Sequence, residues 1–318
     1  MASNGAAPAR RHVAVVFVHG IFTNNPLFAD VMKKGLRERL GGLPVDFESV
    51  YWADNVRGQQ DNFMARVQAK SAIADSKLRR AVIQGLGDAA AYQKTKKRKN
   101  SIYYDVHEEI GRTLGRFKEL PKNSPLIFIG HSLGSHIIST YAWDVNKMKL
   151  RDEFKGKTAL DEDEEEEKIR VELRNASPLR RLDTFAGLVT FGSNIPLFTF
   201  TFGTHGIFPI TRTPHDDAGN ALGAPAFPGS ALPAGLQGKA RWLNFYSERD
   251  VLGFPLKPLN DYFEQEARIE DICVQKETRL SRLLPYLFCY SAHGCYWNNA
   301  LVLDRTAQLI RDMVETPA

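Results

Sequence analysis

Short apolar runs recur along the chain and alternate with amphipathic stretches. Val13–Val18 and Leu126–Ile129 are continuous apolar runs, which is typical of strands buried on both faces of a parallel sheet. The remaining runs with strand character are Val45–Trp52, Asp183–Phe191, Ala240–Tyr246 and Ile269–Val274. The pattern therefore predicts a sheet built from these segments.

The stretches between the runs have helical spacing. Phe28–Leu40 is expected to be a helix that ends at Gly41, with an apolar face made by Leu27, Val31, Leu36 and Leu40. The other expected helices are Asn62–Tyr92, Ile102–Leu120, Ser135–Trp143 and Tyr296–Met313. Strands that alternate with helices predict an α/β fold with a mainly parallel central sheet flanked by helices.

No linker divides the chain, so we expect one domain over residues 12–318 after a disordered tail at 1–11. Insertions are expected near 53–100, 149–178 and 194–238. The first holds a helix beyond the minimal fold, which suits a lid or a substrate-binding wall. The second contains the acidic run Asp161–Glu167, which predicts a solvated surface excursion. The third carries the aromatic segment Ile195–Phe202, whose side chains suit an acyl pocket and a packed core equally well.

Composition narrows the class of protein without deciding it. The 318 residues are 43% hydrophobic and 25% charged, as in ordinary globular proteins, and the net charge of +5 does not predict a nucleic-acid partner. Cys273, Cys289 and Cys295 lack metal-ligand spacing and are expected to be reduced thiols. Neither a secretory signal nor a membrane-spanning run is recognisable, so a cytoplasmic location is expected. The sequence predicts no metal site and no cofactor.

One basic run stands out against this balance. Lys94, Lys96, Lys97, Arg98 and Lys99 lie within six consecutive positions. They could contact phosphates or the headgroups of a membrane surface, but such a run is more often a solvated loop, which is the favoured interpretation.

The strongest chemical signal is the segment Gly130–Gly134, which reads Gly-His-Ser-Leu-Gly between a predicted strand and a predicted helix. A sharp strand-to-helix turn of this kind needs glycine where the two backbones pass closely, and it raises the serine hydroxyl above the sheet. The helix start beside Ser132 also supplies N–H groups that can face an oxyanion. Ser132 is therefore the candidate nucleophile.

Three further candidates follow predicted strands, so they should meet Ser132 at one edge of the sheet. They are His19 with Gly20, Asp250 and His293. The competing histidines are His136, His205 and His215, but only His293 follows both the last strand and the acid. Glu248 competes with Asp250, whereas Asp183 stands at a strand start and should lie at the opposite edge.

The elbow and the chain order serine, aspartate, histidine resemble the α/β-hydrolase superfamily. Gly-His-Ser-Leu-Gly and the early His19-Gly20 are similar to its lipase and serine-esterase branch, and the segments around Asp250 and His293 are similar to its acid and histidine segments. The resemblance implies an α/β-hydrolase fold with insertions or a lid.

The chemistry assigns a role to each candidate. A serine hydroxyl needs a base, here His293, and a carboxylate that orients the base, here Asp250. Leu133 N–H is one oxyanion donor, and the resemblance implies Ile21 as the second, with Phe22 the alternative. His19 and Gly20 are expected to order the oxyanion loop, and His131 to support Ser132.

These assignments predict a serine hydrolase that cleaves a carboxylic ester, with a hydrophobic acyl or lipid ester favoured as substrate. The alternative is a non-catalytic scaffold of the same fold that binds a hydrophobic ligand or a protein partner. A serine without a neighbouring histidine would favour the scaffold.

Overall fold

The computed structural model describes residues 10–71, 76–94, 101–153, 164–215, 220–221, 223–275 and 292–315. These residues contain a six-stranded sheet in the order β2-β1-β3-β4-β5-β6, in which all neighbouring strands are parallel. The strands are β1 Val13–Val18, β2 Val45–Val50, β3 Leu126–His131, β4 Phe185–Phe191, β5 Arg241–Ser247 and β6 Ile269–Gln275. Each lies where an apolar run predicted it, and the predicted α/β fold class is confirmed.

Burial explains why these runs form strands. Every residue of β1, β3 and β4 is buried, as expected for central parallel strands covered on both faces. The edge strand β2 is mostly half-buried. The buried centre of the sheet, where β1 pairs with β3 and Val15 lies opposite Ile127, is therefore a rigid support for the residues that follow these strands.

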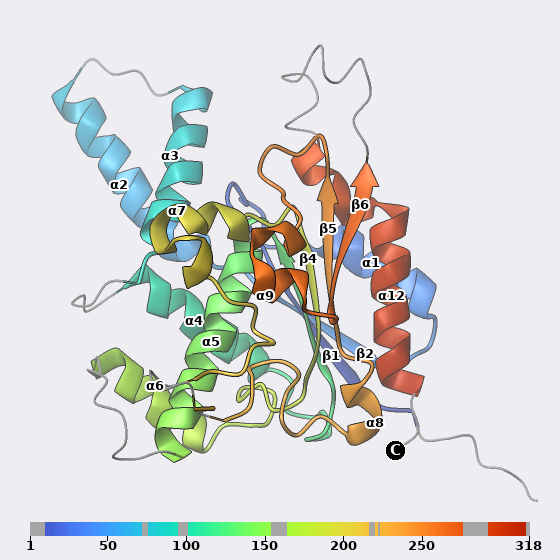
Figure 1. Ribbon diagram of the computed structural model, residues 1–318. Helices are drawn as coiled ribbons and strands as arrows, with labels where there is room; N and C mark the ends of the chain where they lie inside the picture. The colour runs from blue at the N-terminus through green and yellow to red at the C-terminus, as the bar shows by residue number, and fades with distance from the viewer. Residues whose placement is uncertain are drawn as a thin grey trace, which may run out of the picture.

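Helices cover both faces of the sheet (Figure 1). Helices α1 and α12 pack together on one face, whereas α4, α5 and α6 lie on the other. Helices α2 and α3 form a hairpin beside the end toward which the strands point. The helices are α1 Asp30–Leu40, α2 Asp54–Lys70, α3 Lys77–Ala91, α4 Ile102–Leu114, α5 Leu133–Glu153, α6 Glu164–Arg174, α7 Thr199–Phe202, α8 Ala234–Gln237, α9 Asp261–Glu264 and α12 Ala300–Glu315, with 3₁₀ turns η1 Ile195–Phe198, η2 Thr204–Gly206, η3 Lys257–Leu259 and η4 Cys295–Asn298.

The predicted apolar face of the first helix was partly wrong. Leu27 and Val31 are 62% and 59% exposed. Helix α1 instead turns Met32, Leu36 and Leu40 inward. The cause is its partner helix: a Cβ at Gly35 would lie 2.9 Å from a methyl carbon of Leu303 on α12, so this side of α1 must face α12.

The predicted helix Asn62–Tyr92 was also wrong as a single element. Helix α2 ends at Ser71, whose backbone is extended, and α3 begins anew after Ser76. The Ser76 hydroxyl accepts a hydrogen bond from Arg79 N (3.2 Å), a helix cap that the hydrophobic spacing did not show. Similarly, α4 ends before Gly115 and not at Leu120.

Several predicted features fall outside the described residues. They are tail residues 1–9, the basic residues Lys96 to Lys99, Asp161 to Asp163, and Cys289. The rest of the acidic run, Glu164–Glu167, forms the first turn of α6. Within the described chain, no helix has the length and apolar character needed to cross a membrane.

Candidate active site

Candidate site residues follow several strands at the carboxyl edge that the parallel strands share. The residues that come directly after β1, β3 and β4 are His19, Ser132 and Gly192, and Asp250 lies just beyond the end of β5. His293 joins them from the C-terminal segment, where its carbonyl oxygen accepts a hydrogen bond from His131 Nε2 at 2.9 Å. The residues that the sequence predicted for the site therefore do converge.

Ser132 occupies a strained turn between β3 and α5. Its φ of 53° lies in the left-handed region that residues with a side chain rarely adopt. Its N–H donates to Phe191 O at 3.0 Å, and its carbonyl accepts from Ser135 N at 3.0 Å. These two backbone hydrogen bonds therefore stabilise the strained conformation of Ser132, as surrounding contacts do at strained turns in other functional sites.

Close backbone approach accounts for the glycines around this turn. A Cβ at Gly134 would lie 2.3 Å from Val18 O, and a Cβ at Gly130 would lie 3.0 Å from Ser135 Cα. Gly20 is closest to the chemistry, because its Cβ would meet Ser132 Cβ at 2.5 Å and Ser132 Oγ at 3.0 Å. The turn packs directly onto the loop that follows β1.

The buried Asp250 carboxylate pairs with the half-buried His293. Nδ1 of His293 lies 2.9 Å from both carboxylate oxygens of Asp250. An ionised carboxylate only accepts, so Nδ1 donates and Nε2 keeps a lone pair. This is the tautomer that a general base requires. The carboxylate partner of His293 is therefore Asp250 and not Glu248.

Two further donors fix the carboxylate. Tyr296 donates its hydroxyl to Oδ2 at 2.8 Å, and Leu252 N donates to Oδ1 at 3.0 Å. Burial alone would raise the pKa of Asp250, but the hydrogen bond and charge of His293, with these two donors, outweigh it and lower the pKa. Tyr296 was not predicted from the sequence as a site residue; its position three residues after His293 was the available signal.

Gly192 and Gly253 leave room for the pair. A Cβ on Gly192 would lie 3.1 Å from His293 Cε1, and one on Gly253 would lie 2.4 Å from Asp250 Oδ2. Gly192 also follows Phe191, whose carbonyl holds Ser132 N. The His293 imidazole and the turn at Ser132 therefore both contact the segment Phe191–Gly192.

Of the buried side-chain atoms that lack a hydrogen-bond partner among the described residues, two belong to the predicted catalytic residues. Ser132 Oγ and His293 Nε2 are both buried and neither makes a hydrogen bond. Buried polar atoms are normally paired, so an unpaired hydroxyl and imidazole nitrogen at one edge call for an explanation. A hydroxyl and a lone pair are what a serine nucleophile and its base bring to a substrate.

His19 organises the loop after β1. Its Nδ1 lies 2.7 Å from Gly20 O and its Nε2 accepts from Trp52 N at 3.1 Å, while its ring stacks on the Trp52 indole. Burial lowers the pKa of His19 to about 3, with a smaller opposing contribution from the Gly20 hydrogen bond. His19 is therefore a neutral, fully engaged side chain beside the site.

His131 is likewise neutral. Burial and then the charge of His293 lower its pKa to about 3. Among the competing histidines, His136 lies on α5 with its ring stacked on Phe198, and His215 pairs its backbone with Ala221. Asp183 binds Lys149 and Arg181 before β4, at the opposite edge, as predicted.

The sheet order and the turn at Ser132 decide the fold. The strained serine follows the strand β3 at the middle of an all-parallel sheet, with a helix starting directly behind it. The chain has the α/β-hydrolase fold.

Comparisons with known proteins add little beyond the fold. No family model matches the sequence, and no curated protein is similar to it. Similar solved structures include the esterase domain of a Rhodothermus marinus protein (11% identity, 97% of this chain and 91% of that chain, TM-score 0.38). Others are polyneuridine aldehyde esterase (10%, 94% and 99%, 0.36) and a lipase-esterase related protein from Clostridium acetobutylicum (11%, 97% and 100%, 0.35). At such values, function must be argued from the site itself.

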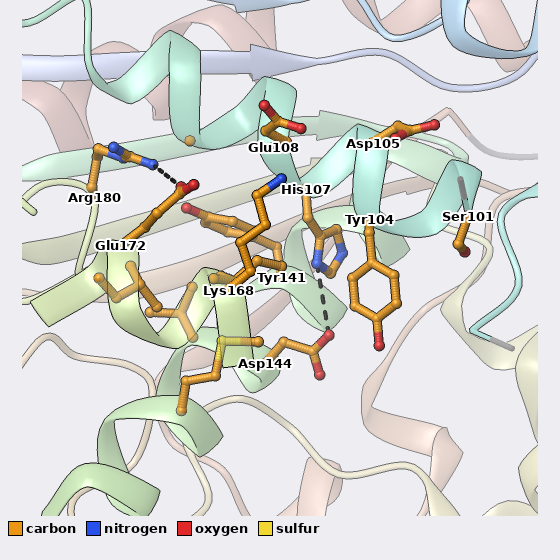
Figure 2. A pocket seen from close by; sticks show the side chains of 15 residues that line it. Ser101, Tyr104, Asp105, His107, Glu108, Tyr141, Asp144, Lys168, Glu172 and Arg180 are labelled. Atoms are coloured by element: carbon orange, nitrogen blue, oxygen red, sulfur yellow. Dashed lines mark hydrogen bonds and ion pairs between the residues drawn. The ribbon is translucent and has the colours of Figure 1, made fainter. Parts of the chain in front are cut away.

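A polar cavity of about 270 Å³ lies away from Ser132, between α4, α5 and α6. Figure 2 shows His107 turned toward Asp144, and Arg180 toward Glu172. Asp144 also accepts hydrogen bonds from Tyr103 (2.9 Å) and Lys94 (3.0 Å). Asp144 is therefore paired within the protein.

The phenylalanine side chains of the aromatic segment Ile195–Phe202 differ in their burial. Phe198 packs on His136, whereas Phe200 and Phe202 are exposed. Phe202 lines a mainly apolar cavity of about 280 Å³ beside α5, together with Trp143 and Phe208. The segment is therefore neither fully packed core nor the lining of a closed acyl pocket.

In the part of the chain that the structure describes, no cluster of side chains could hold a metal ion. Cys273 and Cys295 are free, half-buried thiols. Lys94, the first residue of the basic run, is engaged by Asp144. Membrane contact through the rest of that run stays a prediction.

Proposed function

We propose that the protein is a serine hydrolase that cleaves a carboxylic ester through a covalent acyl-enzyme. The observation that carries the proposal is the Asp250–His293 pair, which leaves His293 Nε2 with a free lone pair at the sheet edge where the unpaired Ser132 hydroxyl lies. Ser132 Oγ attacks the ester carbonyl carbon while His293 Nε2 takes the hydroxyl proton. The resulting imidazolium is stabilised by the Asp250 carboxylate.

The tetrahedral intermediate then collapses. His293 returns the proton to the alkoxy oxygen, the bond from that oxygen to the acyl carbon breaks, and the alcohol leaves. Water attacks the acyl-enzyme with His293 again as base, releasing the acid and restoring the Ser132 hydroxyl. No step requires a metal or a cofactor.

The oxyanion donors in this proposal are Leu133 N–H and Ile21 N–H. Leu133 begins α5 directly after the nucleophile. Ile21 follows Gly20, which abuts Ser132. Phe22 is the alternative donor. Each donor aimed at the oxyanion is worth about 10²–10³ in rate.

A hydrophobic acyl or lipid ester is the substrate class that we propose. Exposed apolar side chains lie on the elements around the catalytic edge, where an acyl chain would approach: Phe22 after β1, Leu86 on α3, Phe202 on α7 and Val251 after β5. Burying them against an acyl chain adds about 25 cal/mol per Å² of apolar surface. A longer chain should therefore bind better.

Hydrolysis of 4-nitrophenyl esters of increasing acyl length tests this function. We expect turnover that improves from acetyl to medium chains and falls to the buffer rate in Ser132→Ala. The matched control is Ser139→Ala, since that hydroxyl donates only within α5, to Ser135 O at 3.0 Å. Equal activity in wild type and Ser132→Ala would sink the proposal. A folded wild type that binds these esters without cleaving them would favour the non-catalytic scaffold.

A further inference from the structure

A row of polar side chains crosses three neighbouring strands of the sheet. Thr190 on β4, Asn244 on β5 and Asp271 on β6 lie directly opposite one another in the strand register. Thr190 and Asn244 are fully buried, and Asp271 is half-buried. We call these three residues the polar row. Polar groups at such positions are costly unless their hydrogen bonds are made, so the polar row calls for an explanation.

Each member of the polar row is hydrogen-bonded to the next. The Thr190 hydroxyl accepts from Trp242 Nε1 at 2.9 Å and donates to Asn244 Oδ1 at 2.8 Å. The Asn244 amide nitrogen donates to Asp271 Oδ1 at 2.7 Å and to the carbonyl oxygen of Phe254 at 3.1 Å. Both amide hydrogens and the amide oxygen of Asn244 are used, which fixes its orientation. The polar row therefore reaches beyond the sheet to the loop after β5.

Asp271 holds the same loop a few residues further on. Its carboxylate accepts from Leu256 N at 2.9 Å and from Lys257 N at 2.8 Å. Sheet pairing does not require these contacts, because parallel strands bond through their own backbone groups. Hydrogen bonds from backbone N–H groups to a carboxylate are strong. The polar row therefore fastens the loop at Phe254, Leu256 and Lys257.

The fastened loop begins at Asp250, and its first residues touch that carboxylate. Leu252 N donates to Asp250 Oδ1 at 3.0 Å, and a Cβ at Gly253 would lie 2.4 Å from Asp250 Oδ2. The next residue is bonded on both sides, because Phe254 N donates to Ser193 O at 3.0 Å while its carbonyl accepts from the polar row. The residues that contact the carboxylate are thus continuous with those that the polar row holds.

We infer that Asn244 and Asp271 are positioning residues for the Asp250 carboxylate. Both hold the loop from Phe254 onward, and the residues just before it contact both oxygens of the carboxylate. The polar row therefore fixes where Asp250 meets His293. The inference rests on the proposed function, and it makes β6, at one edge of the described sheet, a determinant of the catalytic rate.

The replacement Asp271→Asn tests this role with little change in side-chain size. An amide has one acceptor oxygen and one donor group, so it cannot accept from Asn244 and from the loop amides together. The matched control is Glu270→Gln, the same kind of change at the preceding position of β6, where the carboxylate accepts from Arg305 on α12 at 2.7 Å. Thr190→Val is a milder second variant if Asp271→Asn does not fold, because it removes one hydroxyl that orients Asn244.

Two readouts are taken on each protein. They are amide hydrogen exchange of residues 250–257, and kcat and KM on a 4-nitrophenyl ester, with kcat expressed per active site counted by fluorophosphonate titration. In Asp271→Asn we expect exchange at Leu256 and Lys257 to rise about tenfold or more, kcat to fall about 10- to 100-fold, and KM to stay within about twofold. Thr190→Val should move both readouts the same way by less. Glu270→Gln should match wild type.

The two readouts keep failures apart. Unchanged exchange in Asp271→Asn, or faster exchange with unchanged kcat, overturns the positioning role of the polar row. A rise in KM with constant kcat also overturns it, because a displaced acid weakens proton transfer and not substrate binding. Faster exchange in Asp271→Asn of a protein whose wild type hydrolyses no ester refutes the proposed function while leaving the hold of the polar row on the loop established.

Discussion

At the scale of single residues, three buried histidines are held neutral. Burial lowers the pKa of His19 and His131 to about 3 and that of His107 to about 4. His19 and His131 flank Ser132, where a positive charge would disturb the proton transfer assigned to His293. His19 needs a neutral ring, because its Nδ1 donates to Gly20 O while its Nε2 accepts from Trp52 N.

These pKa values predict how stability depends on pH. The unfolded chain takes up a proton on each of these histidines near pH 6.5, whereas the folded protein does so only near pH 3–4. The unfolded state binds more protons in between, so stability falls as the pH drops through this window, by about 1.4 kcal/mol per pH unit for each histidine. Asp250, with its lowered pKa, keeps its charge throughout most of that range.

Urea unfolding at pH 7.5, 6.0 and 5.0 measures this dependence. We expect the free energy of unfolding to decrease steadily toward pH 5. In His107→Gln this decrease should be smaller by about 1.4 kcal/mol per pH unit, which is the contribution of one proton. A free energy that is constant between pH 7.5 and 5.0 is incompatible with three buried neutral histidines.

At the scale of elements, a polar network ties α3, α4 and α5 together. Tyr92, directly after α3, bonds His107 Nε2 on α4 at 2.7 Å and Thr140 Oγ1 on α5 at 2.5 Å. Asp144, on α5, accepts from Tyr103 and Lys94 and lies 3.7 Å from His107 Nδ1. The end of α3 is therefore anchored to α5, the helix that begins directly after Ser132.

Removing the centre of this network should be costly. We expect Asp144→Ala to lower the free energy of unfolding by about 3 kcal/mol, because it removes the carboxylate that accepts from Tyr103 and Lys94 and lies 3.7 Å from His107. The control is Glu108→Ala on α4, whose exposed pair with Arg112 (3.6 Å) is worth about 0.5 kcal/mol or less. Chemical denaturation of wild type and the two variants gives both values. Equal stability of the two variants would show that the network does not hold α3, α4 and α5 together.

At the scale of the whole molecule, the strands and the strand-end chemistry were predictable from the sequence. Parallel strands are marked by local apolar runs, and their common polarity brings Ser132 and Asp250 to one edge wherever the intervening helices lie. His293 could be chosen from its place after the last strand. The pairing of Asp250 with His293 needed no knowledge of distant packing.

What could not be predicted depends on contacts between distant segments. The inward face of α1 is set by Leu303 on α12, which the spacing of Leu27 and Val31 does not encode. The break between α2 and α3 needs the cap at Ser76.

The most direct test of the central claim is covalent labelling with a fluorophosphonate, read by intact mass and peptide mapping. Wild type should gain one adduct, located on Ser132, and Ser132→Ala and His293→Ala should gain none while remaining folded by circular dichroism. Labelling reports an activated serine without requiring the natural ester. A folded wild type that stays unlabelled, or an adduct that persists in His293→Ala at the wild-type rate, would contradict the assignment of Ser132, His293 and Asp250 as a catalytic unit.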